Sequence, residues 1–230
     1  GNFATLKDNL IVDRRAGRIP TSENEKLCMR INSSLKNIQG IRISLYPGKE
    51  HRFVVRFRGE GLSDSLSDAD PQKENKPRFY TSPLSKDAER AASVVNKFLD
   101  EVTRLLKDSP KTSTVLLRGF SKFPTLPTME ELFKLEPAAI ANYPMYKGLA
   151  KLVGMDIIDV GQELDDLFHA LEKNYKDYDF FYVHVKKTDS AGEDGNFEVK
   201  KKAIEETDRY IPRIIALEPE VFVVTSDHST

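Results

Sequence analysis

The stretches DFFYVHVKKTDSAGEDG (residues 179–195) and EVFVVTSDHST (residues 220–230) decide how the rest of the chain is expected to fold. Each begins with β-branched and aromatic residues and ends in acids or a histidine. The apolar runs at residues 180–185 and 221–224 predict strands buried on both faces. A helical segment, about residues 197–217, lies between them. The pattern predicts a strand-helix-strand unit whose strands are parallel neighbours joined by a right-handed crossover.

Four polar residues follow these two strands: Asp189, Glu193, Asp227 and His228. Parallel neighbours end at the same edge of a sheet, and ligands bind at that edge in open α/β sheets. Three carboxylates and one imidazole repel each other unless a cation joins them, and this set suits Mn²⁺, Mg²⁺ or Zn²⁺. The alternative is that both clusters only form turns and helix caps.

The spacing of these four residues leaves the number of ions open. Asp189 and Glu193 are predicted to lie in a glycine-containing loop that folds back on one ion. Asp227 and His228 are adjacent, and adjacent side chains of an extended segment point to opposite sides. They therefore bind the same ion only through a turn, and otherwise serve one each of two ions.

Length and composition restrict the class of protein. The 230 residues are 39% hydrophobic and 31% charged with 12 glycines, which is ordinary for one large or two small globular domains. The net charge of −1 gives no case for nucleic-acid or membrane-surface binding. No apolar stretch approaches the ~20 residues that cross a bilayer. The single cysteine, Cys28, excludes an internal disulfide and fits a reducing cytosol.

The predicted pattern of helices and strands changes near residue 110. Residues 1–110 predict a small α+β domain with a hairpin arm at residues 51–58 and a long loop at residues 59–83. Residues 111–230 alternate strands and helices, which predicts a parallel sheet covered by helices. We expect a strand at residues 115–117 to belong to this sheet. The sequence leaves the oligomeric state open.

The arginines of the first domain gather in two places, residues 14–18 and residues 52–58. Alternate residues of a strand point the same way, so the second group shares one face of the hairpin arm. A guanidinium binds phosphate or carboxylate by two parallel hydrogen bonds. The alternative is a solvated face paired with the abundant acids, because surface ion pairs are common and weak. The residues concerned are Arg14, Arg15, Arg18, Arg52, Arg56 and Arg58.

Ordered blocks along essentially the whole chain resemble the cofactor-independent phosphoglycerate mutases of the archaeal type, members of the alkaline phosphatase superfamily. The blocks are NFAT (2–5), IVDRRAGRI (11–19), EHRFVVRFRG (50–59), SDADP (67–71), LLRG (116–119), ANYPMYKGLAKLVGM (141–155), HVKKTDSAGEDG (184–195) and TSDHST (225–230). The resemblance implies an alkaline-phosphatase-like sheet in residues 111–230, with residues 1–110 as a substrate-binding domain inserted into it.

The resemblance also implies a set of site residues. Asp189, Glu193, Asp227 and His228 correspond to ligands of two metal ions, Mn²⁺ first, with Mg²⁺, Co²⁺ or Zn²⁺ as alternatives. The family often has His where this chain has Glu193, although an acid also suits a hard cation. The implied substrate contacts are Asp13, Arg14, Arg15, His51 and Arg52, with Arg118 and Lys147 following strands of the second domain. The family's nucleophile lies upstream of the block NFAT, so we expect this chain to be a central fragment that does not turn over by itself.

The implied activity is the interconversion of 3-phosphoglycerate and 2-phosphoglycerate through a phosphoenzyme, in glycolysis and gluconeogenesis, by a cytoplasmic enzyme whose partner is a small phosphorylated substrate. The first rival is a metal-dependent phosphohydrolase of the same superfamily, which would lack the arginine-rich domain. The second is a non-catalytic binding module. Product analysis separates the first rival from the mutase, and manganese calorimetry tests the second.

Overall fold

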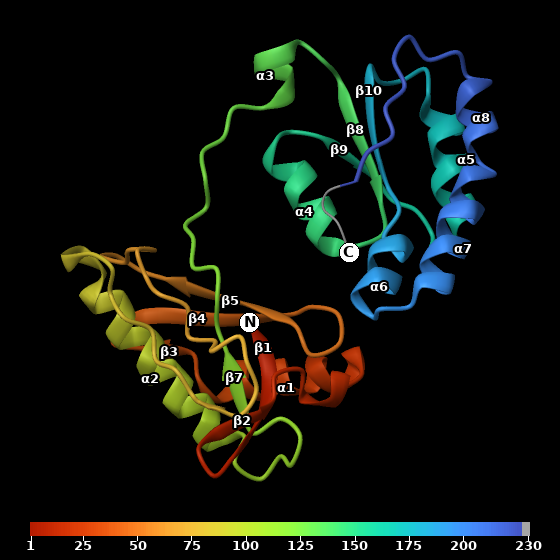
Figure 1. The fold of residues 1–230 in the computed structure, drawn as a ribbon. Helices are drawn as coiled ribbons and strands as arrows, with labels where there is room; N and C mark the ends of the chain where they lie inside the picture. Colours follow the sequence, from red (N-terminus) through yellow and green to blue (C-terminus); the bar gives the residue numbers. More distant parts are fainter. Residues whose placement is uncertain (227–230) are drawn as a thin grey trace. The chain divides into compact units, whose positions relative to one another are not determined.

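The protein is described here by a computed structural model that covers residues 1–226 and divides into two compact units (Figure 1). The first unit is Gly1–Phe123 and the second begins at Pro124. We had predicted a boundary at residue 110. The boundary lies later in the chain, because strand β7 (Thr114–Leu116) pairs antiparallel with β1 (Asn2–Lys7) inside the first unit. The predicted strand at residues 115–117 therefore does not belong to the parallel sheet.

The first unit contains two antiparallel sheets and two long helices. One sheet has the order β6-β2-β1-β7 and the other β3-β4-β5. The remaining elements are β2 (Leu10–Asp13), η1 (Ala16–Arg18), α1 (Thr21–Ser34), β3 (Asn37–Ile38), β4 (Ile41–Pro47), β5 (Phe53–Arg58), β6 (Lys76–Pro77), η2 (Lys86–Ala88) and α2 (Glu89–Leu105).

A large hydrophobic core, beside a smaller cluster of Ala4, Ile11 and Leu116, holds the first unit together. Ile41, Ile43 and Leu45 alternate along β4 and are all buried, as the period of two in a half-buried strand requires. They share a hydrophobic cluster with the buried faces of α1 and α2. Phe57 of β5 packs edge-on against Phe98 of α2, with ring centroids 5.4 Å apart. This core fixes the β4–β5 hairpin, whose turn carries His51 and Arg52.

The second unit is a three-stranded parallel sheet with the order β10-β8-β9. Helix α4 lies on one face of the sheet, and α5, α7 and α8 lie on the other side (Figure 1). A parallel sheet covered by helices is confirmed for this unit. Its elements are α3 (Met129–Phe133), β8 (Pro137–Ala141), α4 (Pro144–Leu152), β9 (Asp156–Ile158), α5 (Leu164–Asn174), β10 (Phe180–His184), α6 (Lys187–Glu193), α7 (Phe197–Asp208) and α8 (Ile211–Ile215).

Two predictions for the end of the chain are corrected by the structure. Residues 197–217 form two helices, α7 and α8, and Pro212 lies in the first turn of the second. Residues 221–224 do not form a strand, and Val223, for example, is 71% exposed. A strand needs a neighbour for its backbone hydrogen bonds, and no strand of the described chain pairs with this segment. Within residues 1–226 no helix is long and apolar enough to cross a membrane.

Candidate functional site

The loop after β2 is held in a left-handed turn by Asp13. One carboxylate oxygen of Asp13 accepts from the backbone N–H of Arg15 (2.7 Å) and the other from that of Gly17 (2.6 Å). Ala16, Gly17 and Arg18 have φ values of 49°, 64° and 51°. Non-glycine residues in this region cost about 1–2 kcal/mol each, so the Asp13 bonds and the burial of Ala16 must offset that strain. The turn leaves Arg15 and Arg18 exposed at the surface.

The β4–β5 turn is fastened to α1 by Asn24, which is fully buried. The Asn24 amide nitrogen donates to the backbone carbonyls of Glu50 and Arg52, both at 2.6 Å. His51 lies between these two acceptors and is only 2% exposed. Sequence reasoning missed Asn24, because a single Asn in a helical pattern gives no sign of a partner far along the chain. Asn24 thus sets the backbone that presents His51 and Arg52.

Electrostatic interactions connect the β4–β5 turn to the loop after β2, which carries Arg14, Arg15 and Arg18 and which we call the arginine loop. Burial lowers the pKa of His51 to about 4, with a further contribution from the positive charge of Arg52. The charges of Arg15 and Arg18 act on His51 in the same direction, so the two arginines lie near the imidazole. The His51 Nδ1 atom has no hydrogen-bond partner in the described chain, and the nearest Glu50 carboxylate oxygen is 3.9 Å away. The structure therefore gathers Arg15, Arg18, Arg52 and a neutral His51 at one site, which we call the arginine–histidine cluster.

Arg14, unlike the members of this cluster, pairs with a buried acid. Its guanidinium donates two hydrogen bonds to the Asp70 carboxylate, from Nε at 3.0 Å and from Nη2 at 2.7 Å. The Asp70 side chain is 1% exposed and also accepts from the backbone N–H of Gln72 (2.9 Å). This pair fastens the β2 loop to residues 67–72. Asp13 and Arg14 therefore shape the arginine loop.

Arg118 belongs to the first unit, contrary to the expectation that it follows a strand of the parallel sheet. It comes after β7 and is exposed. Asn2 of β1 pairs with Leu116 of β7 and forms a bridge to Arg52. Arg118 thus lies at the end of the first unit that carries Arg52.

In the second unit, Asp189 and Glu193 follow β10 on the short helix α6, where a loop had been predicted. Residues four apart on a helix lie on the same face. The two carboxylates therefore share one face of a helix, where a loop that folds back on one ion was predicted. Asp189 is 9% exposed, and its carboxylate pairs with the Lys186 ammonium. Glu193, at the end of α6, is exposed.

Lys147 lies in the first turns of α4, just after β8, at the carboxyl edge of the parallel sheet. Its ammonium pairs with the exposed carboxylate of Asp159 at 3.1 Å. Since Asp159 follows β9, this pair joins the ends of two neighbouring strands. Lys147 and Asp189 therefore both follow the carboxyl ends of strands of one parallel sheet.

The proposed metal set is represented in part. Asp227 and His228 lie outside the described residues, and within residues 1–226 no group of three or more His, Cys, Asp or Glu side chains is arranged to hold a metal. The two carboxylates that are described are hard oxygen donors on one helical face, which is the chemistry that Mn²⁺ or Mg²⁺ selects. Asp189 and Glu193 thus fit half of such a site.

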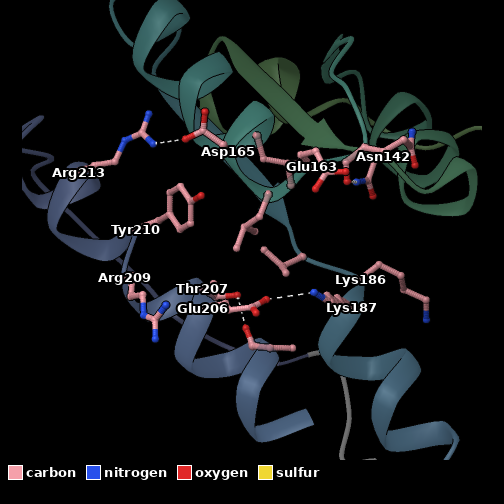
Figure 2. Close-up of a pocket in the computed structure, with 15 residues that line it drawn as sticks. Asn142, Glu163, Asp165, Lys186, Lys187, Glu206, Thr207, Arg209, Tyr210 and Arg213 are labelled. Atoms are coloured by element: carbon pink, nitrogen blue, oxygen red, sulfur yellow. Dashed lines mark hydrogen bonds and ion pairs between the residues drawn. The ribbon is translucent and has the colours of Figure 1, made fainter. Parts of the chain in front are cut away.

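A cavity of about 740 Å³ opens at the same edge of the sheet (Figure 2). Leu164, Leu167, Val185 and Ala203 supply its apolar lining. Its rim is crossed by ion pairs between Lys187 and Glu206 (3.1 Å) and between Arg213 and Asp165 (2.6 Å). Sequence reasoning missed this cavity, because α7 and α8 were expected to be one helix.

Comparisons with known proteins agree with each other. The family model for 2,3-bisphosphoglycerate-independent phosphoglycerate mutase matches residues 1–111. A probable enzyme of that name from Thermosipho africanus is 54% identical over 230 residues, which is 100% of this chain and 57% of the relative. A further one, from Thermus thermophilus, is 47% identical over 234 residues, which is 100% of this chain and 58% of the relative.

Solved structures give the same result for the fold. A cofactor-independent phosphoglycerate mutase from Thermoplasma acidophilum matches 94% of this chain and 60% of its own length, with 29% identity and a TM-score of 0.61. A protein from Pyrococcus horikoshii, 22% identical, matches 94% of this chain and 53% of its own length with a TM-score of 0.65, which shows the fold alone. The chain spans between half and three fifths of the length of each of these relatives.

Proposed function

We propose that this chain, as a member of the 2,3-bisphosphoglycerate-independent phosphoglycerate mutase family, supplies the substrate-binding unit and part of the metal-binding unit of an enzyme that interconverts 3-phosphoglycerate and 2-phosphoglycerate. The observation that carries the proposal is 54% identity across the whole chain to a relative of that name. Transfer through a phosphoenzyme, a role in glycolysis and gluconeogenesis, and a cytoplasmic location are parts of the same proposal.

The arginine–histidine cluster is the proposed grip on the substrate. A phosphoglycerate carries a phosphate and a carboxylate, and each suits the fork of a guanidinium. Arg15 and Arg52 supply such forks, and a neutral His51 offers one N–H that donates without adding charge. Arg118 adds a further cation at the same end of the unit. In this proposal Asp13 and Arg14 hold the loop in shape instead of contacting the substrate. Lys147 of the second unit is a further proposed substrate contact.

The second unit is proposed to hold two divalent ions, Mn²⁺ first, in an alkaline-phosphatase-like site. Asp189 and Glu193 are the described ligands, and Asp227 and His228 complete the set. When bound, the ions stabilise charge on the attacking and leaving oxygens of phosphoryl transfer. The residues of this chain hold these carboxylates on one helical face. The arginines keep the glycerate bound while it reorients.

Product analysis tests the proposal. The protein translated from the complete reading frame that contains this chain is incubated with 3-phosphoglycerate and Mn²⁺, without 2,3-bisphosphoglycerate, and followed by ³¹P NMR. We expect 2-phosphoglycerate to form without free phosphate, and we expect residues 1–230 alone to give neither. Release of free phosphate as the sole product would assign the protein to the phosphohydrolases.

A further inference from the structure

Lys186 neutralises a buried carboxylate that the proposed function assigns to a metal ion. Its ammonium contacts the carboxylate of Asp189, three residues later. The two side chains are only 20% and 10% exposed, so water screens the pair poorly. A carboxylate that is shielded in this way needs a nearby cation, because an unpaired buried charge is strongly destabilising.

A second attraction also acts on Lys186. Its ammonium lies over the ring of Tyr143, 5.4 Å from the centroid, and Tyr143 precedes α4 at the end of β8. The neighbouring Lys187 differs in each respect. It is 67% exposed and pairs with Glu206 across the cavity at 3.1 Å. Figure 2 shows the two amines pointing in different directions, with only that of Lys187 turned toward Glu206.

We propose that Lys186 is an internal counter-ion for Asp189 that a divalent ion must displace. The inference rests on the proposed metal site, and it adds a residue whose role the family comparison does not supply. An ammonium and a metal ion compete for the same carboxylate oxygens, and two cations at contact distance repel each other strongly where water is excluded. The ring of Tyr143 keeps an attractive position for the ammonium once it has left Asp189.

Free Mn²⁺ in solution, followed by its EPR signal during titration of the protein translated from the complete reading frame that contains this chain, tests the proposal. Lys186→Met removes the competing charge and should bind Mn²⁺ at least tenfold more tightly than the wild type. Lys186→Arg keeps a cation at this place and should stay within about threefold of the wild type. Lys187→Met is the matched control and should stay within twofold, because its partner is Glu206.

The metal site stands if the wild type binds Mn²⁺ and Asp189→Asn does not. If Lys186→Met then binds Mn²⁺ only as tightly as the wild type, or more weakly, the inference is overturned. Absence of Mn²⁺ binding in the wild type would overturn both. Lys186→Gln replaces Lys186→Met if circular dichroism shows that the methionine variant does not fold. In EDTA the folded Lys186→Met chain should melt at a lower temperature than the wild type, with Mn²⁺ raising its melting temperature by the larger amount; an unchanged melting temperature in EDTA also contradicts the inference.

Discussion

At the scale of single residues, neighbouring side chains in the first unit differ in whether their polar groups are bonded inside the protein or exposed at its surface. The Asp13 carboxylate accepts hydrogen bonds from backbone N–H groups, and the Arg14 guanidinium donates to Asp70, so both bond inside the protein. Arg15, next in the sequence, is exposed and acts electrostatically on buried His51. The family resemblance predicted all four as substrate contacts, and it could not separate them because burial and partners depend on residues distant in the chain.

His51 should make stability depend on pH. Its folded pKa of about 4 is lower than the ordinary value of 6.5, so below pH 6.5 the unfolded chain takes up a proton that the folded chain does not. Stability is therefore lost as the pH falls from 6.5 toward 4, by roughly 2–3 kcal/mol at pH 4.5. Urea unfolding of the wild type at pH 7 and 4.5 should show this loss, and His51→Gln should lack it. A His51 resonance that titrates near 6.5 in NMR would contradict the prediction.

Arg14 and Arg15 should respond oppositely to the same substitution. Arg14→Met leaves the Asp70 carboxylate, 1% exposed, without its guanidinium and should cost about 3 kcal/mol of unfolding free energy. Arg15→Met removes an exposed side chain and should change stability by less than about 0.5 kcal/mol. Urea denaturation of both variants checks this. Equal losses in the two would mean that Arg15 is also part of the framework.

At the scale of elements, the hairpin and both long helices of the first unit follow from local patterns, while strand partners do not. Strand β7 was recognised as a strand but assigned to the wrong sheet, since its pairing with β1 joins residues more than a hundred positions apart. Residues 189–193 form a helix because the glycine there is flanked by residues that tolerate helix. The capping box of Thr128 and Glu131, a purely local signal, opens α3.

The fastening of the β4–β5 turn by Asn24 should control the environment of His51. Asn24→Leu leaves the carbonyls of Glu50 and Arg52 without their donor and should cost about 3 kcal/mol. Loosening of the turn should raise the pKa of His51 toward 6.5, which NMR measures directly.

The matched control is Asn32, which lies on the same helix and bonds both backbone groups of Leu45, at 2.8 and 2.7 Å, away from the turn. Asn32→Leu should also destabilise the protein but should leave the pKa of His51 near 4. A His51 pKa that moves equally in the two variants would show that general loosening, and not the Asn24 contact, is responsible.

At the scale of the whole chain, each unit has its own hydrophobic core, and in residues 1–226 no core cluster includes residues from both. We therefore expect residues 1–123, expressed alone, to fold. The ¹H–¹⁵N spectrum of this piece should overlay that of the same residues in the longer chain, and His51 should keep its pKa of about 4. A collapsed, poorly dispersed spectrum would show that the first unit depends on the second.

The binding of 3-phosphoglycerate to the ¹⁵N-labelled 230-residue chain, followed residue by residue, tests the central claim most directly. The account predicts chemical-shift changes concentrated at residues 13–18 and at His51 and Arg52, and their loss in the double variant Arg15→Met/Arg52→Met. Shifts confined to residues outside this set and away from Arg118 and Lys147, or shifts that persist unchanged in the double variant, would contradict it.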